Sequence, residues 1–187
     1  MKIDRKIGVD ILGEGEPKIP HPSDDNWNGI SLPWMAFGYG VSLTPLQQLT
    51  FYNAVANNGE MVKPSFINSI GSIGEKPIYQ IDREIIMPSI SSKETLKSVK
   101  KMLLNVVEKP WGTANNIYDK DLKIAGKTGT AQVDYTKDET QYISSFVGYF
   151  PADDPKYSSI VVIHKPKKSE GYYGNTVAAP VFKRVAK

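Results

Sequence analysis

A short run of lysine, threonine and glycine is the part of this sequence with the clearest capacity for chemistry. Residues 125–132 read AGKTGTAQ and lie within β-type sequence. A lysine in a shielded cleft places a positive charge beside a bound carboxylate or a proton relay. Hydroxyls from Thr128 and Thr130 can donate to that carboxylate, and Gly129 permits close approach to the backbone. Lys127, Thr128, Gly129 and Thr130 are therefore the candidate site residues.

The alternation of side chains along a strand sets a condition on this site. Lys127 falls on one face of the strand, whereas Thr128 and Thr130 fall on the other. All three can line one cleft only if the strand is an accessible edge. Free N–H and C=O groups on such an edge can pair with an extended peptide, and N–H donors can stabilise an oxyanion.

Two other interpretations of the same run are weaker. Gly126-Lys127-Thr128 looks like the end of a phosphate-binding loop, but that motif needs a glycine where Asp121 stands. Its lysine should also open a helix, whereas β-type sequence follows here. The second alternative is an incidental lysine on a solvent-exposed strand.

Composition excludes several classes of site. The 187 residues contain no cysteine and two histidines, His21 and His164. Disulfide scaffolds, thiol catalysis, zinc–cysteine sites, iron–sulfur clusters and multi-histidine metal sites are therefore excluded. A net charge of +3 gives little support to nucleic-acid binding. The acidic pairs, at positions 24–25 and 153–154, lie in proline-flanked turns typical of solvated acids. We expect neither a metal nor a cofactor.

The sequence predicts three helices. The first has Thr44 as its N-cap, Pro45 in its first turn, and a left-handed stop at residues 57–59. The second is predicted to begin with a capping box formed by Ser91 and Glu94, and to end at residues 109–110. Its apolar stripe comprises Leu96, Val99, Leu103, Val106 and Val107.

The last third of the chain changes to strand periodicity. Residues 124–132, 142–150 and 159–164 predict three strands, and their short connections favour an antiparallel meander. The third helix is predicted over about residues 177–186, with Val181 and Val185 buried. The expected fold class is α+β, an antiparallel sheet with packed helices.

Four segments occur in the order typical of class B penicillin-binding proteins. The run at residues 127–130 resembles the third motif of that family, and three further segments resemble its preceding helix entry, its next strand and its closing segment. These are residues 38–47 (GYGVSLTPLQ), 145–151 (SFVGYFP) and 173–182 (YGNTVAAPVF). The resemblance is strongest to division-type peptidoglycan D,D-transpeptidases, and the implied fold is part of the penicillin-binding, β-lactamase-like domain.

The resemblance also implies an activity. Family members acylate a serine with the penultimate D-Ala of a stem peptide, release the last D-Ala, and pass the acyl group to a neighbouring amine; penicillins trap the acyl-enzyme. It assigns Lys127 to catalysis and Thr128, Gly129 and Thr130 to substrate binding, with the Thr130 N–H in the oxyanion hole. It implies no cofactor, with stem peptides, β-lactams and division proteins as partners. It also implies a periplasmic location, with an inner-membrane anchor outside this chain.

The sequence departs from the family pattern at the nucleophile. Its one Ser-x-x-Lys, from Ser98 to Lys101, lies just before the candidate strand and is interpreted as a solvated helix face. No Ser-x-Asn triplet occurs. We therefore interpret residues 1–33 as an irregular lead segment and residues 34–187 as the C-terminal part of a transpeptidase domain. We expect the isolated chain to form no acyl-enzyme and to leave apolar faces uncovered.

Two other classes of function stay open. A β-lactamase or β-lactam sensor shares the Lys-Thr-Gly strand, although the three flanking segments favour the transpeptidase. A non-catalytic interaction module built from a degenerate domain is the second alternative.

Overall fold

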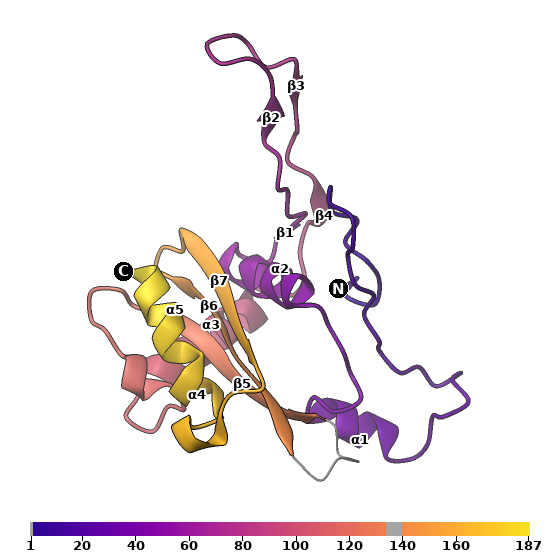
Figure 1. Ribbon diagram of the computed structural model, residues 1–187, viewed down its shortest axis with the longest axis vertical. Coiled ribbons are helices and arrows are strands. Elements are labelled where there is room, and N and C mark those ends of the chain that lie inside the picture. Colours follow the sequence, from indigo (N-terminus) through magenta and orange to yellow (C-terminus); the bar gives the residue numbers. More distant parts are fainter. Residues whose placement is uncertain (1, 134–139) are drawn as a thin grey trace.

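A three-stranded antiparallel sheet forms the centre of the protein (Figure 1). The computed structural model describes residues 2–133 and 140–187. Strands β5 (Ala125–Val133), β6 (Gln141–Phe150) and β7 (Tyr157–His164) follow one another in chain order, with β6 in the middle. The predicted meander and the α+β class are confirmed. The connection between β5 and β6 lies outside the described residues.

Two helices cover one face of the sheet. Helix α2 (Pro45–Ala56) contacts β6 and β7, and α3 (Lys93–Glu108) contacts β5. The buried residues of this layer include Val55, Leu103 and Tyr149. The Lys100 ammonium joins the two helices by donating to the Ala56 carbonyl at 3.0 Å, and burial lowers the pKa of Lys100.

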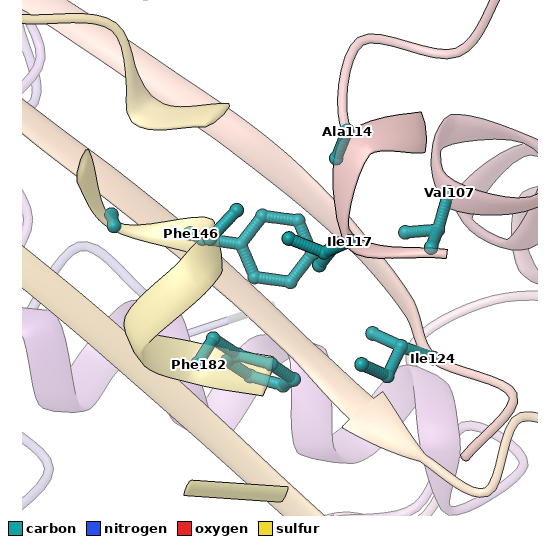
Figure 2. Packing of buried hydrophobic residues seen from close by; sticks show 8 residues of the cluster. Val107, Ala114, Ile117, Ile124, Phe146 and Phe182 are labelled. Atoms are coloured by element: carbon teal, nitrogen blue, oxygen red, sulfur yellow. The ribbon is translucent and has the colours of Figure 1, made fainter. Parts of the chain in front are cut away.

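The opposite face carries the C-terminal helices. Helix α4 (Gly174–Val177) and helix α5 (Ala179–Ala186) lie over β6, beside the short 3-10 helix η1 (Asn115–Ile117). Figure 2 shows Phe146, Ile117 and Phe182 converging in the core cluster of this layer. Phe146 and Phe182 meet edge to face, with ring centroids 4.8 Å apart.

Helix α2 has the predicted boundaries because both of its ends are capped. Thr44 accepts a hydrogen bond from the Gln47 N–H, and the Gln47 side chain accepts one from the Thr44 N–H. This capping box satisfies two N–H groups that the first turn leaves unpaired. At the other end, Asn58 and Gly59 have φ values of 54° and 99°, the predicted left-handed stop.

Two details of the helix predictions were wrong. The N-cap of α3 is Ser92, which accepts from the Thr95 N–H, and not Ser91 with Glu94. The predicted C-terminal helix is divided in two around Ala178, and Val185 is exposed. Ala179 and Phe182 are the residues that α5 buries, because the actual packing stripe is displaced from the predicted one.

A hairpin arm projects away from this layered body (Figure 1). Its base is the pairing of β1 (Met61–Val62) with β4 (Ile85–Met87), and its outer part is the pairing of β2 (Ser69–Ile70) with β3 (Tyr79–Gln80). Both β2 and β3 are exposed on all their residues. The arm therefore adds no side chain of β2 or β3 to the buried core.

Residues 2–30 are irregular and are held by polar contacts within the segment and to the body. The Glu14 carboxylate accepts hydrogen bonds from the N–H groups of Ile7, Gly8 and Val9. Lys18 pairs with Ser42 through two backbone hydrogen bonds, and the Gln47 side chain donates to the Arg5 carbonyl.

Helix α1 (Ser31–Ala36) follows this segment and buries none of its residues. With its neighbours it forms an exposed apolar patch, defined by Ile30, Pro33, Trp34, Phe37 and Tyr39. Phe37 is 83% exposed. An uncovered apolar surface of this kind matches the expectation from sequence. Within the described ranges, no helix is long and apolar enough to cross a bilayer.

Candidate functional site

The candidate residues lie on β5, at the edge of the sheet. Over the described residues, β5 pairs with β6 and with no other strand, so its second edge is unpaired. Ala125 packs in the α2–α3 layer, whereas Ile124 packs in the α4–α5 layer. Alternation from these two anchors places Lys127 and Gly129 on the first face, and Thr128 and Thr130 on the second. The accessible edge that the sequence required is present.

Lys127 turns back onto the strand that carries it. Its side chain is exposed, and its ammonium donates to the carbonyl oxygen of Thr128 at 2.7 Å. The positive charge of Lys127 therefore lies at the Thr128 carbonyl, next to the residue whose side chain is on the other face of the strand. From this position one lysine can act on a ligand that also contacts Thr128.

Thr128 meets a second hydroxyl from outside the strand. Its Oγ1 lies 3.2 Å from the Oγ1 of Thr113, in the turn between α3 and η1. That turn is held by hydrogen bonds from the Ala114 N–H to the Val106 carbonyl and from the Asn115 side chain to the Val107 carbonyl. The end of α3 therefore positions a hydroxyl beside β5.

Thr130 is held by the start of α4. The Gly174 N–H donates to Thr130 Oγ1 at 3.0 Å. A side chain at position 174 would not fit, because its Cβ would lie 2.4 Å from the Ser145 carbonyl oxygen and 2.5 Å from that of Gly129. Glycine at 174 thus lets the helix start lie directly on the strand. A Cβ at Gly129 would lie 2.5 Å from Ser145 Oγ, so a side chain there would require the Ser145 hydroxyl to move.

Three tyrosines stack next to this helix start. The rings of Tyr142 and Tyr172 are stacked with centroids 4.1 Å apart, and Tyr173 lies 4.5 Å from Tyr172. The hydroxyls of Tyr172 and Tyr173 are hydrogen-bonded at 3.2 Å, and the contact with Tyr172 raises the pKa of Tyr173. Tyr173 directly precedes Gly174 and is 55% exposed. The stack therefore gives an aromatic surface near Thr130.

The structure gives Ser98 no part in this arrangement. Ser98 and Lys101 are exposed on α3, and the Ser98 hydroxyl donates to the Glu94 carbonyl of its own helix at 3.0 Å. This is the solvated helix face that the sequence predicted. Across the residues that the structure describes, no three His, Cys, Asp or Glu side chains are grouped to hold a metal ion.

Sequence reasoning missed three contributors to the site. Thr113 lies in a Gly-Thr-Ala turn at residues 112–114, to which no chemical role was assigned from sequence. Gly174 was noticed as part of a family-like segment, without its contact to Thr130. Tyr142 carried no signal, because thirty residues separate it from Tyr172 and no spacing rule connects them.

The sequence matches the family described as penicillin binding protein transpeptidase domain over residues 2–187. The chain belongs to this family, and the predicted membership is confirmed. Stage V sporulation protein D of Bacillus subtilis is 35% identical over 182 residues, which cover 95% of this chain and 27% of the relative. Peptidoglycan D,D-transpeptidase FtsI of Buchnera aphidicola is 30% identical over 186 residues, 98% of this chain and 31% of the relative.

Solved structures of penicillin-binding proteins share the fold of this chain. Penicillin binding protein 3 of Mycobacterium tuberculosis superposes with a TM-score of 0.79 at 28% identity, over 98% of this chain and 42% of that one. It has also been solved in complexes with aztreonam and with ampicillin. Penicillin-binding protein 2B of Streptococcus pneumoniae has the same TM-score at 20% identity, which supports the fold alone. The chain spans about a third of the length of the curated relatives it matches.

Proposed function

We propose that this chain supplies the substrate-binding strand of a peptidoglycan D,D-transpeptidase. The observation that carries the proposal is the edge strand β5, which presents Lys127, Thr128 and Thr130 with each side chain held by a specific contact. Family membership makes a serine acyl-enzyme the matching chemistry. Residues 34–187 then form the C-terminal part of the domain, and residues 1–33 lead into it.

Each residue has a defined task in this function. The stem peptide lies along the free edge of β5 as an added strand. Thr128 and Thr130 donate to the carboxylate of its terminal D-Ala, and the Thr130 N–H stabilises the oxyanion. Lys127 adds positive charge and assists proton transfer. A serine outside this chain attacks the penultimate D-Ala carbonyl, the terminal D-Ala leaves as its amine, and a neighbouring stem-peptide amine then accepts the acyl group.

The same proposal sets ligands and location. β-Lactams bind as mimics of the D-Ala-D-Ala end, and no cofactor takes part. The function places the protein on the periplasmic side, where peptidoglycan is cross-linked, with an anchor supplied from outside this chain. The upstream part of the domain is the first partner of this chain, and other division proteins are further partners.

The first test compares the chain with a completed domain. We define the joined protein as this chain fused behind the upstream part of Bacillus subtilis Stage V sporulation protein D, in place of the matching region. Both are incubated with a fluorescent penicillin and separated by denaturing electrophoresis. We expect a covalent label on the joined protein and none on the 187-residue chain. Stable labelling of the chain alone would contradict its inactivity, and an unlabelled, folded joined protein would contradict the function.

The second test separates the transpeptidase from the other two classes. We expect the joined protein to stay acylated and to turn over a chromogenic cephalosporin at no more than a trace rate. Rapid, repeated turnover would favour a β-lactamase. A folded joined protein that binds neither penicillin nor stem peptide would favour the interaction module.

A further inference from the structure

The turn between α3 and η1 packs closely against the end of α3. A Cβ at Gly112 would lie 2.3 Å from the Val106 carbonyl oxygen, so the chain passes directly against the helix end. Ala114 is fully buried in the core cluster with Val107 and Ile117 (Figure 2). Thr113, between these two fixed residues, is exposed. Its hydroxyl is thus presented from a fixed backbone.

The partner of this hydroxyl is a candidate ligand-binding group. Thr113 Oγ1 lies 3.2 Å from Thr128 Oγ1, and the two residues belong to separate elements. A hydroxyl has one proton to donate and can accept through its lone pairs. If Thr113 donates to Thr128, the Thr128 proton is directed elsewhere. Thr128 then becomes a committed donor towards an anion at the strand edge.

Thr130 has the same arrangement with a donor that cannot reverse its role. The Gly174 N–H donates to Thr130 Oγ1, so the Thr130 proton is also free for a ligand. Each of the two β5 hydroxyls therefore has one partner outside the strand, the Thr113 hydroxyl for Thr128 and the Gly174 N–H for Thr130. A carboxylate, which accepts and cannot donate, is the ligand that two such donors fit.

We propose that Thr113 is a positioning residue that acts through Thr128, and that its hydroxyl holds the Thr128 hydroxyl as a donor to the carboxylate of the bound peptide or β-lactam. This inference rests on the proposed function, because it requires a carboxylate ligand on β5. It predicts a role in binding the carboxylate end and none in the acylation step itself.

The test uses the joined protein with Thr113→Val, which keeps the shape of the side chain and removes the hydroxyl. Acylation by benzylpenicillin is separated into an initial binding constant and an acylation rate constant. We expect binding to weaken about tenfold, the usual effect of losing a hydrogen bond that supports a charged group. The acylation rate constant should change by less than about twofold. Thr113→Ser should restore binding to within about threefold of the original.

A ligand without the charge provides the second readout. The methyl ester of benzylpenicillin lacks the anionic carboxylate, so Thr113→Val should leave its already weak binding unchanged. Equal loss of binding for the acid and the ester would overturn the inference in favour of a structural role. No loss for the acid would overturn it as well.

Folding and the proposed function are controlled separately. Thermal unfolding of each variant shows whether the turn is intact, and Thr113→Ala, which keeps the backbone hydrogen bonds of the turn, takes the same test if the valine variant does not fold. An unlabelled original joined protein would contradict the proposed function and this inference together. A labelled original protein with no effect of Thr113 contradicts the inference alone.

Discussion

At the scale of single residues, the hydroxyl groups of the site have hydrogen-bond partners, whereas a hydroxyl in the core has none among the described residues. Thr128 and Thr130 each have a partner from another element and remain accessible for a ligand. Tyr149 is fully buried under α2 and α3, and its hydroxyl has no hydrogen-bond partner among the described residues. A buried polar group without a hydrogen-bond partner costs free energy, so the Tyr149 hydroxyl lowers the free energy of unfolding.

Replacing this tyrosine should stabilise the protein and change its response to alkali. Burial raises the pKa of Tyr149 to about 12, whereas an unfolded tyrosine titrates near 10. Between these pH values the folded chain keeps a proton that the unfolded chain loses. The free energy of unfolding therefore falls as the pH rises, by up to about 1.4 kcal/mol per pH unit.

Tyr149→Phe should remove this part of the alkaline loss and raise stability at neutral pH by about 1 kcal/mol. Urea unfolding at pH values from 7 to about 11, near the tyrosine pKa, measures both effects. Tyr157→Phe, at a tyrosine that is 67% exposed, is the matched control and should change neither. A destabilised Tyr149→Phe variant would show that the hydroxyl has a partner after all.

Lys127 is the residue on which the acylation chemistry should depend most. In the joined protein, Lys127→Ala should slow penicillin acylation at least about 100-fold, the usual scale for loss of a group that assists proton transfer. Lys101→Ala, on the exposed face of α3, is the control and should have no effect. Measured labelling rates decide the matter: if Lys101→Ala or Ser98→Ala abolished labelling instead, the helix pair would be the nucleophile motif.

At the scale of elements, capping contacts connect the helices to the rest of the chain. Gln47 completes the capping box of α2, is 2% exposed, and donates to the Arg5 carbonyl in the irregular N-terminal segment. The same side chain thus caps the start of α2 and binds a residue 42 positions away. Helix α3 begins with a simpler cap, since Ser92 satisfies the Thr95 N–H without a box. The start of α2 therefore also holds the N-terminal segment, whereas the cap of α3 satisfies an N–H group of its own helix.

Thr44→Ala should lower the free energy of unfolding by about 1 kcal/mol, because an N-cap hydroxyl and its reciprocal partner are lost. Thr44→Ser keeps the accepting oxygen, so its free energy of unfolding should stay within about 0.5 kcal/mol of the original value. Urea denaturation compares the two variants. Equal stability of all three proteins would mean that tertiary packing alone holds the start of α2.

At the scale of the whole molecule, two surfaces lie outside the layered core. The apolar patch on α1 leaves Trp34 and Phe37 exposed at 52% and 83%. The hairpin arm exposes Ile73 and Ile78 at its tip, at 105% and 83%. The ion pair at its base, between Arg83 and Glu60, is partly exposed to solvent and contributes little to stability.

Shortening the arm should leave the body intact. Lys63 N–H donates to the Glu84 carbonyl, which matches the closing pair of a two-residue hairpin turn. Replacing residues 64–83 by Asn-Gly should change the free energy of unfolding by less than about 1 kcal/mol, because a shorter loop costs less entropy and no core residue is removed. Calorimetry of the shortened chain tests this, and a loss above about 2 kcal/mol would show that the arm folds as part of the core.

The sequence by itself determined the features that depend on neighbouring residues. The candidate run at residues 127–130, the boundaries of α2, the apolar stripe of α3 and the three strands all follow from local spacing, capping and periodicity. Local pattern was less reliable at the start of α3 and in the C-terminal helices. There, adjacent serines offer alternative caps, and packing against the sheet selects the buried stripe.

Only the tertiary structure decided which groups meet at the strand. Thr113 and Thr128 are 15 positions apart, and Gly174 and Thr130 are 44 positions apart. No periodicity connects residues at such separations, because the contacts depend on how the end of α3 and the start of α4 pack on β5. The sequence supplied a lysine and two hydroxyls, and the packing of two other elements gave each of those hydroxyls a hydrogen-bond partner.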